Sequence, residues 1–232
     1  MNLRLDWCSY EAAKYAVEHW HYSQRMPKSK LARIGVWEDE KYIGCVLFGV
    51  GATGDLVKQF GLDKFQGCEL VRVALTNHST PVSRINAIAL KMLKREFAGL
   101  RLVVSFADPE HGHVGGIYQA GGWIYTGDSV PADEYIINSK RWHGRSLRNT
   151  KPEGITTEQY IAHLDPNYQK IKGSSKHRYL YPLDEAMWKQ IELLRRPYPK
   201  RGEGEIDSAA QSNVQTEGAS PISPLLTHET LT

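Results

Sequence analysis

The sequence is poor in cysteine and has no long apolar run. Its three cysteines, Cys8, Cys45 and Cys68, are odd in number and irregularly spaced, which argues against a disulfide framework and favours the reducing cytoplasm. No stretch of about 18 apolar residues occurs, so we expect no membrane span. The segment Met1 to Asp6 lacks the apolar core of a secretion signal. These absences predict a soluble cytoplasmic protein.

A strong net charge is also lacking, but the charge is unevenly distributed. The chain of 232 residues carries +3. Residues 197–232 hold two basic and five acidic residues, so residues 1–196 carry +6, and residues 140–178 hold nine Lys or Arg against three acids. A basic body suits a nucleic-acid partner. Residues 197–232 are rich in small and polar residues with few aromatics, which predicts a disordered tail.

Helix and strand patterns alternate along the body. We expect a helix capped by Ser9, a hairpin turning at Asp39–Glu40, and a helix capped by Ser83. Further expected elements are strands at 69–75, 102–107, 123–125 and 135–137, a short helix at 114–120 and a last helix at 184–194. This order predicts an α/β (α+β) fold with a central mixed sheet, flanking helices and a parallel strand pair. We expect a catalytic domain at 1–138, a basic extension at 139–196 that packs on or near it, and the tail.

Polar residues gather directly after the apolar strand 102–107, which includes Ser105. Ligands bind at the carboxyl edge of such strands. Asp108 is either a turn cap, or a base or acceptor for a substrate amine. His111 and His113, with Asp108, form a ligand set suited to zinc or iron, and the alternative is that both are solvent-facing loop histidines.

Several basic residues are candidates for anion binding. Strand alternation puts Arg72 on the face opposite Val71 and Val73, where it is either half-exposed or a cation for phosphate or carboxylate. Ser83 and Arg84, at a predicted helix start, are either a plain cap or an anion site.

A basic segment mixed with an aromatic ring follows residue 139. Such a segment binds backbone phosphates while the ring packs on sugar or base; the alternative is a solvated loop. The residues of this predicted nucleic-acid interface are Lys140, Arg141, Trp142, Arg145 and Arg148, with Arg25 near the first helix.

The stretch 19–28, HWHYSQRMPK, reads from composition alone as the end of an amphipathic helix. His21 is then a surface imidazole near the helix dipole, and Tyr22 anchors the core.

The layout of residues 30–128 resembles the GNAT acyltransferase superfamily. The segment Ile117–Trp123, IYQAGGW, resembles the late motif in which a tyrosine acts as general acid, and Tyr118 is the matching position. The glycine-containing turn that cradles the pyrophosphate of acyl-CoA in that superfamily has no match at residues 77–84. The resemblance therefore points to GNAT-like proteins that take an aminoacyl group from charged tRNA.

A closer resemblance, over most of residues 19–125, is to the phage Mom family of DNA-modifying proteins. It rests on HY followed by RMP at 21–27, ELVRV at 69–73, SFAD with HGH at 105–113, and GIYQA at 116–120. That family converts the N6 amine of adenine to a carbamoylmethyl derivative, which protects phage DNA from host restriction. The resemblance implies functional roles for His21, Tyr22, Arg72, Asp108 and Tyr118.

The resemblance also implies partners and a reaction. The partner is double-stranded DNA with a flipped adenine, in the host cytoplasm. Our hypothesis for the acyl donor is glycyl-tRNA, which would make a charged tRNA a second partner, and acetyl-CoA is the alternative donor. An iron or zinc requirement is left open, as is the choice between monomer and homodimer. Alternatives are an acetyl-CoA-dependent N-acetyltransferase and a non-enzymatic DNA-binding anti-restriction protein. An adenine methyltransferase is disfavoured, because Asp108–Glu110 only begins like its DPPY motif.

Overall fold

A computed structural model of the protein describes residues 2–51 and 55–200. Most of the tail for which we predicted disorder, residues 201–232, lies outside the described residues. The first four tail residues lie on the body, where the hydroxyl of Tyr198 donates a 2.6 Å hydrogen bond to the carbonyl of Trp123. None of the described helices is long and apolar enough to cross a membrane.

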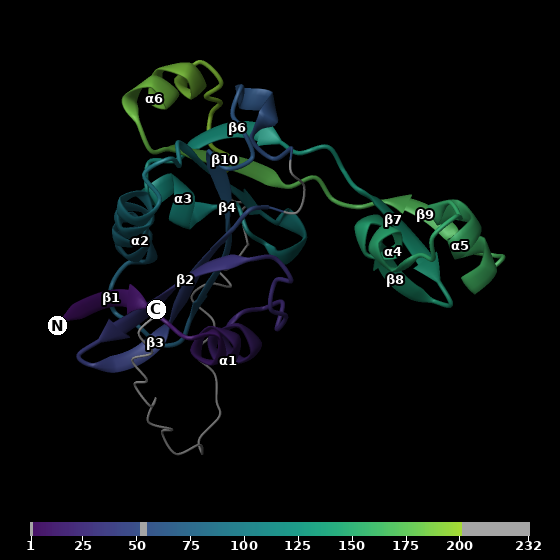
Figure 1. Ribbon diagram of the computed structural model, residues 1–232, viewed down its shortest axis with the longest axis horizontal. Coiled ribbons are helices and arrows are strands. Elements are labelled where there is room, and N and C mark those ends of the chain that lie inside the picture. Colours follow the sequence, from purple (N-terminus) through teal and green to yellow (C-terminus); the bar gives the residue numbers. More distant parts are fainter. Residues whose placement is uncertain (1, 52–54, 201–232) are drawn as a thin grey trace, which may run out of the picture.

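A seven-stranded mixed sheet forms the centre of the molecule (Figure 1). Its order is β1 (Leu3–Trp7), β2 (Leu31–Glu38), β3 (Lys41–Gly49), β4 (Gly67–Leu75), β5 (Leu102–Ala107), β10 (His177–Pro182) and β6 (Ile124–Asp128). Neighbours are antiparallel except β4 and β5, which form the predicted parallel pair. The predicted hairpin is confirmed: Asp39 and Glu40 both have positive φ, 46° and 62°, as a tight two-residue turn requires.

Two helices cover one face of this sheet. They are α2 (Val82–Glu96) and α3 (Gly116–Ala120), and the apolar residues Ile85 and Ala89 of α2 lie in the main core. The N-cap of α2 is Pro81 and not Ser83, so the predicted capping role of Ser83 is wrong. The Glu38 carboxylate accepts hydrogen bonds from the backbone N–H groups of Ser79 and Thr80, just before this helix.

The opposite face is covered in two separate places. Helix α1 (Tyr10–Trp20), capped by Ser9 as predicted, packs on β3 and β4. Helix α6 (Glu185–Glu192) and the 3-10 turn η1 (Lys58–Phe60) pack on β5, β10 and β6. The apolar clusters under α1 and under α6 share no residue. The strip of this face between them, along β4 and β5, is where polar side chains lie, and we call it the polar line.

A second, three-stranded sheet projects to one side (Figure 1). Its order is β8 (Lys140–His143), β7 (Asp133–Ile137) and β9 (Gln169–Lys172), and α4 (Gly144–Thr150) and α5 (Thr157–Leu164) complete this small subdomain. Its own core is Tyr135, Ile137, Leu147 and Ile161. The predicted extension at 139–196 is therefore not one unit. The small subdomain begins at β7, before residue 139, and β10 and α6 return to the large sheet.

Candidate functional site

The site begins where β4 and β5 separate. The two strands pair from Gly67 to Glu69 and from Leu102 to Val104, and no further. The hydroxyl of Ser105 lies at the point of separation, 2.9 Å from the carbonyl oxygen of Leu70 and 2.7 Å from the hydroxyl of Tyr118. Tyr118, on the α2–α3 side of the sheet, therefore lies at the opening between the strands, and the polar line lies on the α1–α6 side of the same opening.

A β-bulge in β4 sets the direction of Arg72. Phe48 of β3 faces Leu70 and Leu47 faces Arg72, so Val71 is an extra residue. Val71 consequently packs with α1, while Val73 packs in the core on the other face. The prediction that Arg72 lies opposite both valines is wrong, because a bulge breaks strand alternation.

The guanidinium of Arg72 is held close to the backbone. Its Nη1 donates a 2.6 Å hydrogen bond to the carbonyl of Val71, while its Nε is buried and has no hydrogen-bond partner among the described residues. An unpaired buried donor is costly and uncommon. Arg72 is thus a cation whose position is fixed by one hydrogen bond and whose Nε–H can still donate another.

Asp108 follows β5 directly, at the carboxyl edge predicted from the sequence. It caps the 3-10 turn η2 (Pro109–His111) by accepting a hydrogen bond from the backbone of Glu110, and its side chain is almost fully buried. The predicted cap is therefore confirmed, and the role of Asp108 toward a substrate amine stays a prediction.

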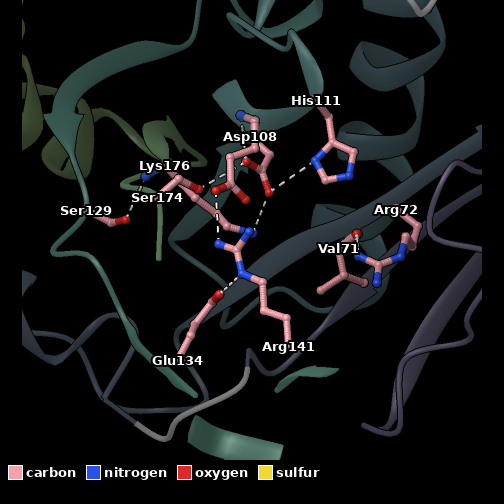
Figure 2. A network of polar contacts seen from close by, with 10 residues as sticks. Val71, Arg72, Asp108, His111, Ser129, Glu134, Arg141, Ser174 and Lys176 are labelled. Atoms are coloured by element: carbon pink, nitrogen blue, oxygen red, sulfur yellow. Dashed lines mark hydrogen bonds and ion pairs between the residues drawn. The ribbon is translucent and has the colours of Figure 1, made fainter. Parts of the chain in front are cut away.

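Figure 2 shows Asp108 at the centre of a polar network. Its Oδ2 lies 2.9 Å from Nζ of Lys176 and 3.7 Å from Nδ1 of His111. Ser174 donates a weak 3.4 Å hydrogen bond to Oδ1. Burial by itself raises the pKa of Asp108, but the hydrogen bond and charge of Lys176 prevail and hold that pKa below its ordinary value.

His21 and Tyr22 come to this loop from the end of α1. The Tyr22 ring lies 4.3 Å from the His21 ring, 4.7 Å from that of His111 and 5.3 Å from that of His113, between centroids. Tyr22 is 54% exposed, so it is not the core anchor that composition favoured. Tyr22 thus lies against the loop that follows Asp108, and His21 lies behind it, within electrostatic reach of His111 and His113.

The protonation of His21 follows from its surroundings. Its Nδ1 accepts a 3.1 Å hydrogen bond from the backbone N–H of Ser23, so a neutral ring carries its proton on Nε2. Burial, followed by the charge of Arg72, lowers the pKa of His21 to about 3. His21 is therefore a neutral imidazole at physiological pH.

Tyr118 is a buried, neutral phenol. The Leu70 carbonyl can only accept, so the single proton of Ser105 points there and the hydroxyl of Tyr118 is left to donate to Ser105. Burial raises the pKa of Tyr118 to about 12, and Tyr22 and Glu69 are among the groups that act on it electrostatically. A neutral phenol with this environment is a proton donor.

Glu69 and Lys176 were not predicted. Glu69 is an acid within the apolar strand segment ELVRVAL, a signal that the sequence already contained. Lys176 lies just before β10, in the connection from the small sheet, and nothing in the sequence marks it as a partner of Asp108. Burial raises the pKa of Glu69, although the charges of Arg72, Arg145 and Lys176 oppose this.

The predicted nucleic-acid residues lie mainly on the small subdomain. Lys140, Arg141 and Trp142 are exposed on β8, and Arg145 and Arg148 lie on α4. A hollow of about 260 Å³ between α4 and α5 is lined by both of these arginines.

Arg141, although exposed, already pairs with two carboxylates of the protein itself. Its guanidinium lies 3.0 Å from Glu110 of the Asp108 loop and is also paired with Glu134 of β7 (Figure 2). Arg141 therefore connects the small subdomain to the site.

Three predicted residues stay apart from this cluster. Within the described residues, no hydrogen bond, ion pair or ring contact joins Arg25, Ser83 or Arg84 to it. The Glu38 carboxylate accepts 3.0 and 2.7 Å hydrogen bonds from the backbone N–H groups of Ser79 and Thr80. An internal anion thus already binds to the turn that leads into α2.

The proposed metal ligands are close but do not form a full ligand set. The rings of His111 and His113 are parallel with centroids 6.4 Å apart. Across the described residues, no group of three His, Cys, Asp or Glu side chains is arranged to hold a metal ion.

Similarity to known proteins extends over the strands of both sheets. The sequence profile of the Mom protein family matches residues 2–200. A curated relative, the methylcarbamoylase Mom of Escherichia phage Mu, is 25% identical over 208 residues, which span 86% of this chain and 84% of the relative.

Proposed function

Because the chain belongs to the Mom protein family, we propose that it is a DNA-modifying enzyme that acts on the N6 amine of adenine. The single observation that carries the proposal is the convergence at the β4–β5 opening. Neutral His21, exposed Tyr22, the cation of Arg72 and the buried phenol of Tyr118 meet there beside Asp108.

The acceptor sets the chemical demands on this site. The lone pair of the N6 amine is delocalised into the ring, so the amine needs an activated donor, a proton acceptor and desolvation. The base must also be flipped out of the duplex to be reached. Tyr22 is well placed for a flipped base, because an exposed ring at the mouth of the site can stack on it.

We assign the remaining site residues by their electrostatics. Tyr118 donates a proton to the leaving oxygen of the donor, which suits a phenol with a pKa of about 12. Arg72 stabilises the oxyanion that develops on the acyl carbonyl. Asp108 is a poor proton acceptor because Lys176 already neutralises it, so it positions Lys176 and His111 and accepts a hydrogen bond from the substrate amine.

Glycyl-tRNA is the donor that we propose. Glycine first acylates N6; its own amine then attacks C6 through a five-membered ring, and collapse leaves a carbamoylmethyl-amine. The Glu38 carboxylate supports a donor other than coenzyme A, because it takes the N–H groups of Ser79 and Thr80 that a pyrophosphate would otherwise use.

Mass spectrometry of nucleosides tests the proposal. Plasmid DNA from cells expressing the protein should contain a modified deoxyadenosine, and labelled glycine should appear in it. The Tyr118→Phe variant should lose the product, whereas Tyr160→Phe, on α5 away from the opening, should keep it. Unmodified deoxyadenosine in wild-type cultures contradicts the proposal.

Two further treatments separate the donor and metal hypotheses. Ribonuclease should abolish an in-vitro reaction that uses glycyl-tRNA, while tight binding of acetyl-CoA in calorimetry would support the N-acetyltransferase alternative. The iron or zinc ion proposed at His111 and His113 is tested by EDTA; since the described residues provide no three-residue ligand set, we route no step through a metal.

A non-enzymatic DNA-binding protein is the second candidate, and the exposed cations of the small subdomain favour it. The variant Asp108→Ala distinguishes the two. Loss of DNA protection with unchanged DNA affinity supports the enzyme, and full protection supports the binding protein.

A further inference from the structure

The proton that leaves the N6 amine needs an acceptor, and the obvious candidates are poor ones. The Asp108 carboxylate is already engaged by Nζ of Lys176 at 2.9 Å, by Ser174 and by the backbone of Glu110. The Nδ1 of His21 accepts the backbone N–H of Ser23, so only its protonated Nε2 remains. Neither group offers a free, basic lone pair to the opening between β4 and β5.

Glu69 occupies a better position. It is the last residue of β4 that pairs with β5, and its neighbours Cys68 and Leu70 both point into the α2-side core. Strand alternation therefore directs Glu69 to the other face, on the polar line between the clusters under α1 and α6.

The carboxylate of Glu69 is also uncommitted. Among the described residues, no hydrogen bond or ion pair within 4 Å engages its oxygens. The charged and titratable groups that act on it come from several elements: Arg72 on β4, Arg145 on α4, Lys176 before β10 and Tyr118 on α3. A charged group at this depth without a direct partner is unusual unless it serves a function.

We propose that Glu69 is the proton acceptor of the acyl-transfer step, an inference that rests on the proposed function. The N6 lone pair forms a bond to the acyl carbon, and the bond from that carbon to the leaving ribose oxygen breaks. Glu69 takes the N6 proton and Tyr118 gives its proton to the leaving oxygen. Transfer of the proton from Glu69 to the Tyr118 phenolate then restores both groups.

The pKa of Glu69 agrees with this role. Burial raises it above the ordinary glutamate value while leaving the carboxylate free, and general bases work best when their pKa is close to the working pH. Asp108 shows the opposite shift because of Lys176. The two carboxylates of the site are thereby separated into a base and a positioning anion.

Initial rates of purified full-length variants test the proposal. The assay mixes each variant with duplex DNA and an extract of non-expressing cells, which supplies the donor whatever it is, and measures modified deoxyadenosine by mass spectrometry from pH 5 to 9. Glu69→Gln should lower the rate by roughly 10²- to 10⁴-fold and abolish the acid limb of the pH profile. Glu69→Asp should retain that limb at a shifted pH.

The controls separate chemistry from folding and from the proposed function. Glu153→Gln, an exposed matched variant, should behave as wild type. If Glu69→Gln unfolds, the pH profile of the Glu69→Asp rate provides the test. An acid limb at the same pH as in the wild type overturns the proposal. A Glu69→Gln rate within about threefold of wild type also overturns it, whereas a wild-type protein that makes no product overturns the proposed function itself.

Discussion

At the scale of single residues, the site contains groups that are unfavourable for stability. Among residues 2–51 and 55–200, the buried Nε of Arg72 has no partner and the half-buried carboxyl of Glu69 has no direct counter-ion; His21 is a desolvated imidazole. Each feature costs free energy of folding, and such costs concentrate where a protein acts on another molecule. Stability and activity should therefore separate when these residues are changed.

Arg72→Met should show that separation. The change removes the hydrogen bond to Val71 but also the unpaired Nε, so the free energy of unfolding should change by no more than about 1 kcal/mol. Activity should fall by roughly 10²-fold or more, because the fixed cation is lost. Urea unfolding and nucleoside mass spectrometry measure the two effects; a large loss of stability with normal activity would contradict the assignment.

His21 should make stability pH-dependent. Its pKa is about 3 in the folded protein and about 6.5 when unfolded, so the unfolded chain binds the extra proton as the pH falls below 6.5. The stabilisation present above pH 6.5 should shrink by about 2 kcal/mol at pH 5. Unfolding midpoints of wild type and His21→Asn should therefore converge on acidification, and parallel curves would refute the depressed pKa.

At the scale of secondary-structure elements, two irregularities of β4 shape the site: a β-bulge and the early end of its pairing with β5. The bulge at Val71 turns Arg72, and the early end of β4–β5 pairing brings Tyr118, on the α3 side, close to the face on which Glu69 lies. Helix α6, which covers β5, β10 and β6, is attached by a polar contact as well as by its apolar face. Asp184 caps α6 and forms two hydrogen bonds, of 2.7 and 3.0 Å, with Arg101.

Asp184 should therefore secure α6. Asp184→Ala loses the cap and the ion pair and should lower the free energy of unfolding by about 2 kcal/mol, while Asp184→Asn keeps a cap and should lose about half of that. The hydrogen bond from Arg101 lowers the pKa of Asp184 to about 2. The advantage of wild type over Asp184→Asn, complete above about pH 4, should nearly vanish as the pH falls to 2, because a protonated Asp184 retains only the cap. Denaturant unfolding against pH measures this, and equal losses for both variants would contradict the capping contribution.

At the scale of the whole molecule, two sheets contribute to one site. The connection between them provides Lys176 to Asp108, and Arg141 of β8 pairs with Glu110 of the Asp108 loop. The small subdomain therefore has two sides: one contacts the active-site loop, and the other carries exposed cations. We assign the exposed cations to the nucleic-acid backbone.

Binding of a 20-base-pair duplex at several salt concentrations checks that assignment. Replacing Lys140, Arg145 and Arg148 together by alanine should reduce the slope of log affinity against log salt by up to about three. Arg141→Ala should reduce it by clearly less than one, because two carboxylates already neutralise that cation. Lys189→Ala on α6, which pairs with Glu185, is the control. A large effect of Arg141→Ala would show that DNA displaces Glu110 and Glu134.

The sequence was sufficient to predict the elements that depend on residues close together in the chain. Apolar spacing predicted β5 and α2, although not the cap of α2, and spacing with turn and cap residues predicted α1 and the β2–β3 hairpin. The polar residues after β5 indicated Asp108. The resemblance of ordered motifs singled out His21 and Tyr22 together with Asp108, and Tyr22 lies against His111 of that loop. These predictions succeeded because periodicity, turn chemistry and motif order are written along the chain.

Only the tertiary structure decided the rest. The bulge in β4, the return of β10 to the large sheet and the small subdomain that begins at β7 depend on pairing between distant strands. For the same reason Lys176 could not be assigned to Asp108 from sequence, nor Arg141 to Glu110. Lys176, which reaches Asp108 only in the folded protein, lowers the pKa of Asp108, and burial raises the pKa of Glu69. In our proposal these opposite shifts distinguish the base from the positioning anion.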